Sequence, residues 1–315
     1  MIRKFKFMPI FMAVAVLTSC GRIVQPMGNN EVATVTSTTV VTEIASETHT
    51  QKTESIDDDV SNQIGTPEHI EINPYMPDGY KLSDSCVIDD FKTVMQEPEL
   101  PTGCEVTALT QTMNYYGFDI DKVDLCDIFM PIDYNGYYTM NEAYLGDPHA
   151  TNGFGCNAPV ILTTAGNYFT WIGSDWYAID LSGIPLEEVF YQIEQGRPVI
   201  VWTTIDQRET YAEFQFELGC GEDFYFNPFQ HCVTIYGYDY SDNTVYIADP
   251  LVGNTQYDME RFERIYDTME QQAVILVGNE KSAGKEYSSE EDKALILKNI
   301  QKNMKEKLNL GDEDE

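Results

Sequence analysis

Two runs of strand-forming residues in the C-terminal third of the chain constrain the fold more than any other feature. HCVTIYGYD and NTVYIADP are rich in β-branched and aromatic residues, and they are joined by residues typical of turns, namely Ser241, Asp242 and Asn243. This pattern predicts an antiparallel β-hairpin. His231 begins the first strand and Asp249 ends the second, so both lie at the end of the hairpin away from the turn. We therefore expect their side chains to come within reach of each other.

The segment that follows Cys104 has the spacing of a helix. Its apolar residues recur at helical intervals, and Gly117 closes it as a helix-ending glycine does. Further elements are predicted by the same criteria: helices over 158–169, 185–195 and 259–269, and strands over 199–205 and 273–277. Helices followed by strands indicate an α+β domain, in which the helix behind Cys104 packs against an antiparallel sheet.

Cys104 stands at the predicted N-terminus of that helix. A thiolate at this position is stabilised by unpaired backbone N–H groups and by the positive end of the helix dipole, so we expect the pKa of the thiol to fall. A nucleophilic thiol also needs a base and a group that orients the base, and the hairpin offers His231 and Asp249. Gln96, eight residues upstream of Cys104, is the candidate donor to an oxyanion.

Each of these residues also has an ordinary structural interpretation. A cysteine before a helix, a histidine in a core strand and an aspartate before a proline are common without any catalytic role, and a glutamine in a proline-rich loop is usually solvated. His49 and His69 precede the domain, which leaves His149 as the rival base. His149 belongs to the irregular segment 146–159, whereas a catalytic base is best held by a regular element, so we prefer His231.

The N-terminus carries the features of a bacterial export signal. Three basic residues precede an apolar stretch from Phe7 to Leu17, which is shorter than the about twenty residues needed to span a bilayer. Small residues then lead to Cys20, a position that resembles a lipobox. We expect residues 1–19 to be removed and Cys20 to carry lipid that anchors the protein to the extracytoplasmic face of the cell membrane. The alternative is a secreted or tethered segment in which Cys20 is incidental.

Composition divides the rest of the chain into three parts. Residues 20–73 are rich in Thr, Ser and Glu and lack helical periodicity, which predicts a disordered tether. Residues 74–278 suffice for one domain with a sizeable core. Residues 279–315 form a charged tail with a predicted amphipathic helix, whose role as a docked or partner-binding helix is open. No segment after the signal has eighteen consecutive apolar residues, so we expect no transmembrane helix.

The net charge of the chain limits the classes of partner that it is expected to bind. The formal net charge is −33, and −36 without the three basic residues of the signal. Such a charge argues against nucleic acid and against direct adhesion to anionic lipid, so the lipid on Cys20 is the expected membrane contact.

Seven cysteines occur in the chain. Beyond Cys20 and Cys104, their spacing is irregular and contains no CxxC pair, so neither a disulfide framework nor a zinc site is predicted. Cys232 is most simply a small buried hydrophobic residue. The pairing of the remaining five stays open: Cys86, Cys126, Cys156, Cys220 and Cys232.

The runs LPTGCEVTAL, GRPVIVW, HCVTIYGYD and YIADP resemble, in order and spacing, the papain-fold cysteine peptidases related to bacteriocin-processing enzymes. The resemblance covers nearly all of residues 74–278 and implies a papain-like fold. By position it implies that Cys104 is the nucleophile, His231 the general base, Asp249 its orienting residue and Gln96 an oxyanion donor. Transporter-fused members trim leader peptides after a double glycine, but the sequence contains no Walker-type motif, so that substrate is not carried over.

The sequence therefore predicts a surface-anchored thiol hydrolase that cleaves a peptide or amide bond. We expect a monomer that acts on a peptide or protein without a cofactor or a metal. Two alternatives remain open. The acyl group could pass to an amine, as in a transpeptidase or a transglutaminase-like enzyme, or the chain could be a catalytically silent binding lipoprotein. Substrate subsites are expected in segments 146–159 and 217–229.

Overall fold

The computed structural model describes residues 72–209, 214–219, 221–279 and 298. The predicted signal segment and Cys20, which was predicted to carry lipid, lie outside the described residues. So do the tether up to residue 71 and, except for Lys298, the tail from residue 280. Among the described residues, no helix is both long enough and apolar enough to cross a bilayer.

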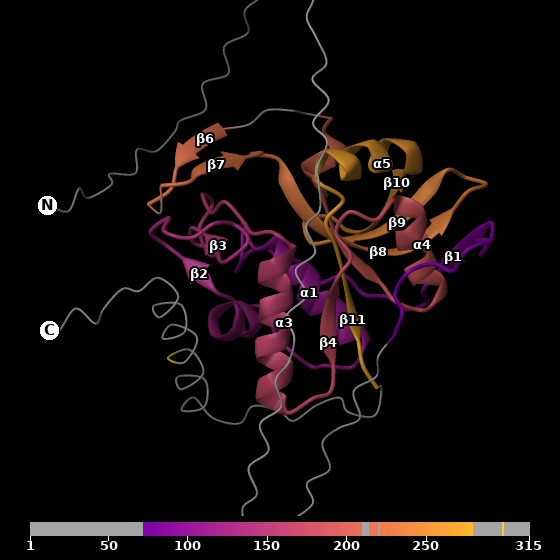
Figure 1. The fold of residues 1–315 in the computed structure, drawn as a ribbon, viewed down its shortest axis with the longest axis horizontal. Coiled ribbons are helices and arrows are strands. Elements are labelled where there is room, and N and C mark those ends of the chain that lie inside the picture. The colour runs from indigo at the N-terminus through magenta and orange to yellow at the C-terminus, as the bar shows by residue number, and fades with distance from the viewer. Residues whose placement is uncertain (1–71, 210–213, 220, 280–297, 299–315) are drawn as a thin grey trace, which may run out of the picture. The chain divides into compact units, whose positions relative to one another are not determined.

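A seven-stranded sheet, antiparallel throughout, organises the domain (Figure 1). Six strands follow one another across it: β10 (Gly253–Asp258), β9 (Thr244–Asp249), β8 (Gln230–Asp239), β5 (Val199–Thr204), β11 (Ala273–Val277) and β4 (Tyr177–Asp180). The short β1 (Ser85–Val87) pairs with the far end of β8. The predicted hairpin is confirmed as β8 and β9, with Asp239 opposite Thr244 beside the turn.

Helices cover both faces of this sheet. The helical elements are α1 (Cys104–Tyr115), α2 (Lys122–Asp124), the π-helical turn η1 (Leu125–Phe129), α3 (Ala158–Ile172), α4 (Leu186–Glu194), the 3-10 turn η2 (Ile205–Gln207) and α5 (Met259–Thr268). The four predicted helices are confirmed as α1, α3, α4 and α5. Helix α3 runs three residues beyond the predicted end because Gly173, with a φ of 68°, supplies the left-handed cap.

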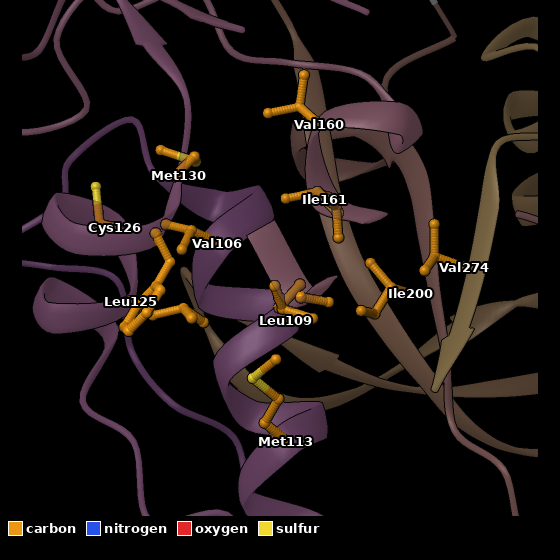
Figure 2. Close-up of a cluster of buried hydrophobic side chains, with 14 of the residues drawn as sticks. Val106, Leu109, Met113, Leu125, Cys126, Met130, Val160, Ile161, Ile200 and Val274 are labelled. Carbon is orange, nitrogen blue, oxygen red and sulfur yellow. The ribbon is translucent and has the colours of Figure 1, made fainter. Parts of the chain in front are cut away.

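Side-chain alternation in the strands divides the core between the two faces. Ile200 and Trp202 of β5 pack with α1 and α3, whereas Val199 and Val201 pack with α4 and α5. On the first face, Leu109 and Met113 project from α1 toward the sheet, as Figure 2 shows. The helix that begins at Cys104 is therefore held against the sheet by its buried face, and its first residue faces the strands of the hairpin.

Several strands were not predicted from the sequence. They are β2 (Ile132–Asp133), β3 (Tyr144–Leu145), β6 (Phe214–Glu217), β7 (Asp223–Phe226), β1, β4 and β10. The sequence of β10, GNTQYD, is mostly polar, and pairing with β9 along its whole length makes it a strand. Segment 217–229, in which substrate subsites are expected, contains β7, which pairs with β6. Aromatic contacts of Phe154 with Phe224 and Phe226 join this β6–β7 hairpin to the segment after β3.

Candidate active site

Cys104 is the first residue of α1 and is 7% exposed. The turn before it is tight: the N–H of Gly103 donates to the carbonyl of Leu100. A Cβ on Gly103 would lie 2.9 Å from the Cβ of Leu100, so only glycine fits without a shift of the backbone. The glycine before the cysteine thus lets the preceding loop fold back onto the start of the helix.

The hairpin brings His231 and Asp249 together. The Nε2 of His231 donates to the Oδ1 of Asp249 over 2.7 Å, and both side chains are buried. The Asp249 carboxylate also accepts the N–H of Leu251 and the hydroxyl of Tyr257. Burial acts to raise the pKa of Asp249, but these hydrogen bonds and the charge of His231 outweigh it and lower the pKa below its usual value. Asp249 is thus an ionised acceptor, and its hydrogen bond places a proton of the imidazole on Nε2.

Buried polar contacts fix α1 on the strands that carry this pair. The Nε2 of Gln111 donates to the hydroxyl of Thr234 on β8 at 2.7 Å and to the carbonyl of Ala248 on β9 at 2.9 Å. The hydroxyl of Thr234 also donates to the carbonyl of Ala108 on α1. At the start of the helix, the backbone of Cys232 hydrogen-bonds the Cys104 thiol. The cysteine therefore lies beside the residue that follows His231.

Glu105 is a further buried group of this site, and sequence reasoning missed it. Its carboxylate is 1% exposed; Oε2 accepts from the Cys104 thiol at 3.3 Å and Oε1 accepts the N–H of Cys156 at 3.0 Å. A Cβ on Gly155 would lie 2.5 Å from Oε1, so glycine makes room for the carboxylate. The available signal was an acidic residue directly after the cysteine, in a helix whose next residues are neutral.

The expected fall in the pKa of the Cys104 thiol is wrong for this conformation. Burial raises the pKa well above its usual value, and the charge of Glu105 raises it further, against the hydrogen bond from Cys232. Burial also raises the pKa of Glu105, although the charge of His231 opposes this. The N-terminus of a helix stabilises a thiolate, but the thiol of Cys104 is buried. The free energy needed to remove a negative charge from water is larger here than the stabilisation from the helix dipole.

Gln96 is buried, not solvated as its proline-rich surroundings suggested. It is 2% exposed, its N–H donates to the carbonyl of Pro250, and its side-chain Nε2 donates to the carbonyl of Pro101 at 2.7 Å. The side-chain Oε1 is buried without a hydrogen-bond partner. The bond to Pro250 ties Gln96 to the residue after Asp249, so the segment before Cys104 is attached to the end of the hairpin.

The rival base His149 is engaged elsewhere. Its Nε2 contacts the Oδ1 of Asp127 at 2.7 Å and its Nδ1 contacts the carbonyl of Glu99 at 2.9 Å. It lies in the irregular segment after β3, as expected. The five described cysteines are all free: Cys86, Cys104, Cys126, Cys156 and Cys232. Cys220 lies outside the described residues.

Comparison with known proteins identifies the family of this chain. The model of the Peptidase_C39 like family matches residues 88–274, a span that contains Cys104, His231 and Asp249. The chain belongs to this family. The uncharacterised protein YvpB of Bacillus subtilis (strain 168) is a relative with 32% identity over 194 residues, which cover 58% of this chain and 72% of YvpB.

A solved structure agrees with the family. A putative C39-like peptidase from Bacillus anthracis has 26% sequence identity and a TM-score of 0.55, with 62% of this chain and 99% of that chain covered. The peptidase domain of Streptococcus ComA, a bifunctional ABC transporter, is a weaker match, with 17% identity and a TM-score of 0.38 over 60% of this chain and 99% of that chain. The domain has the α+β, papain-like cysteine peptidase fold, with α1 packed on the antiparallel sheet.

Proposed function

We propose that this C39-like protein is a thiol hydrolase that cleaves a peptide or amide bond with Cys104 as nucleophile, His231 as general base and Asp249 as the orienting residue. One observation carries the proposal: a buried 2.7 Å hydrogen bond joins His231 to Asp249 on the two strands against which the helix of Cys104 is packed. A bond from Nε2 to a carboxylate leaves Nδ1 of the neutral ring as the nitrogen that can accept a proton.

The resting thiol is neutral in this account, because burial and Glu105 disfavour the thiolate. Nδ1 of His231 takes the proton as the sulfur attacks the substrate carbonyl, and the imidazolium formed is stabilised by Asp249. Collapse of the tetrahedral intermediate breaks the C–N bond, and the proton passes from His231 to the leaving amine. Water, deprotonated by His231, then attacks the thioester, which releases the acid and restores the thiol.

Gln96 is proposed as a donor to the oxyanion, together with the backbone N–H of Cys104. One N–H of the Gln96 amide is held by Pro101, and an amide nitrogen has a second N–H to offer. The bond to Pro101 also supports the orientation of this amide beside the helix start. A preorganised donor of this kind stabilises charge that develops only in the transition state.

Chemical labelling and product analysis test the enzyme proposal together. We expect an electrophilic thiol probe to label Cys104 in folded protein and Cys104→Ala to lose both labelling and cleavage of a peptide library. Cys86→Ser, which removes a partly buried thiol from a different part of the sheet, should keep both. Full cleavage by Cys104→Ala would refute the proposal. Absence of cleavage with an unreactive Cys104 would favour a silent binding protein, and amide products formed with added amine would indicate an acyltransferase.

The lipid anchor on Cys20 is proposed from the sequence of the signal alone. It would hold the hydrolase on the extracytoplasmic face of the bacterial membrane. Metabolic labelling with a radioactive fatty acid should mark the wild-type protein and leave Cys20→Ser unlabelled and released from membranes. Equal labelling of both would contradict it.

A further inference from the structure

Cys126, Asp127 and His149 form a second cluster of reactive side chains, which the proposed reaction does not use. One ligand atom from each, a sulfur, a carboxylate oxygen and an imidazole nitrogen, lie within 4.8 Å of one another. The first two residues belong to η1, and the third comes from the irregular segment after β3. The three atom types are those that bind zinc and similar divalent transition metals in proteins.

Cys126 and Asp127 lie in an uncommon backbone conformation. Residues 125–129 form a π-helical turn, a rare conformation that occurs often at functional sites. In Figure 2 the sulfur of Cys126 points away from Leu125 and Val106, its neighbours in the core. The sulfur lies within 4.8 Å of a carboxylate oxygen of Asp127 and of a ring nitrogen of His149. The sulfur of this buried cysteine is therefore next to two polar ligand atoms.

His149 is oriented as a metal-binding histidine is. Its Nδ1 contacts the carbonyl of Glu99 at 2.9 Å, and its Nε2 faces Asp127 at 2.7 Å. Histidines that bind metals almost always donate their other ring N–H to a carbonyl or a carboxylate, which sets the tautomer and the ring plane. The carbonyl of Glu99 supplies this second contact, and Nε2, which contacts the Oδ1 of Asp127, is the ring atom left to bind the ion.

We propose that Cys126, Asp127 and His149 bind one divalent transition-metal ion of the zinc class. Two ligand atoms about 2.1 Å from a tetrahedral zinc lie about 3.4 Å apart, so the contact between Nε2 and Oδ1 opens by a small side-chain rotation when the ion enters. The exposed side chains of Asp127 and His149 allow this movement. The ion displaces the thiol proton and the proton shared by Nε2 and Oδ1 to solvent, and water or Asp147 completes its coordination.

The ion would cross-link three segments. Residues of η1 and of the segment after β3 supply ligands, and Glu99 of the segment before Cys104 holds the histidine. The N–H of Cys156, in the same segment as His149, bonds to Glu105 beside the nucleophile. The proposed role of the metal is therefore structural: it holds together the segments on either side of the start of α1. This proposal does not depend on the hydrolase proposal.

Zinc titration of the full chain tests the site. Because the Cys104 thiol is itself a potential zinc ligand, all proteins carry Cys104→Ser, and binding is measured by calorimetry with Zn²⁺ and by the thiolate-to-metal absorption of Co²⁺. We expect one ion per chain, a rise in Tm of about 5–10 °C at a hundredfold excess over Kd, and an affinity at least about a hundredfold lower in Cys126→Ser and His149→Gln. Cys86→Ser is the matched control and should bind as the parent does.

Two results would overturn the proposal. One is a parent protein with no saturable binding of Zn²⁺ up to millimolar concentration, and the other is undiminished affinity and Co²⁺–thiolate absorption in Cys126→Ser. Thermal unfolding in EDTA shows whether each variant folds. If Cys126→Ser does not fold, Asp127→Asn is used instead, because the side chain of Asp127 is 48% exposed. This variant must also lose affinity for Zn²⁺.

Discussion

The Nε2 of His231 donates to the Oδ1 of Asp249 over 2.7 Å, and both side chains are buried at the end of the β8–β9 hairpin. This bond sets the tautomer of the proposed base. Asp249→Ala removes the acceptor of the Nε2 proton, so neither the tautomer nor the orientation of the ring is held. We expect kcat to fall by on the order of 10⁴, measured with a peptide substrate. Tyr257→Phe removes only one hydrogen bond to the Asp249 carboxylate and should lower kcat by about tenfold or less.

The same carboxylate predicts a pH dependence of stability. The pKa of Asp249 is lowered from 3.8, so the folded protein holds its charge more strongly than the unfolded chain does. The resulting stabilisation is complete above pH 3.8 and is lost as the pH falls through the lower folded-state pKa. Urea unfolding of wild type and Asp249→Asn should therefore differ at pH 6 and converge in strong acid. A difference that stays constant with pH would contradict this.

Glu105→Gln removes a negative charge next to Cys104, the proposed nucleophile. Because the Glu105 carboxylate raises the pKa of the Cys104 thiol, we expect the rate of alkylation by iodoacetamide to rise several-fold at neutral pH and its pH profile to move toward lower pH. The neutral amide can still accept the N–H of Cys156, so the fold should be retained. An unchanged profile would show that the carboxylate is already protonated in solution.

Gln96→Ala tests whether Gln96 is the proposed donor to the oxyanion. Loss of one such donor typically lowers kcat by about a hundred- to a thousandfold and leaves substrate affinity almost unchanged. Measurement of kcat and KM together distinguishes this from a general loosening of the site, which would raise KM and lower Tm. The backbone bond to Pro250 does not depend on the side chain, so the segment should stay in place.

Gln111→Leu tests the attachment of α1 to the hairpin. The leucine leaves the buried carbonyl of Ala248 and the N–H of Val94 without their partner, which costs about 1–3 kcal/mol for each group that water cannot reach. Urea unfolding should report this loss in the free energy of unfolding. Gln195→Leu, at the exposed residue directly after α4, is the control and should change stability by less than about 0.5 kcal/mol.

Local patterns in the sequence determined much of this protein. The turn between two strand-forming runs was enough to predict the hairpin and the meeting of His231 with Asp249, because antiparallel pairing follows from short-range geometry. Apolar periodicity likewise predicted α1 and placed Cys104 at its first residue.

Only the tertiary structure decided the environment of those residues. Burial of Cys104 beside Glu105 reversed the expected direction of its pKa, since desolvation depends on what packs around a group and not on its neighbours in sequence. The cluster of Cys126, Asp127 and His149 shows the same limit. These ligand atoms come from a π-helical turn and from a distant segment of the chain, and no regular spacing of the three residues in the sequence predicts the cluster.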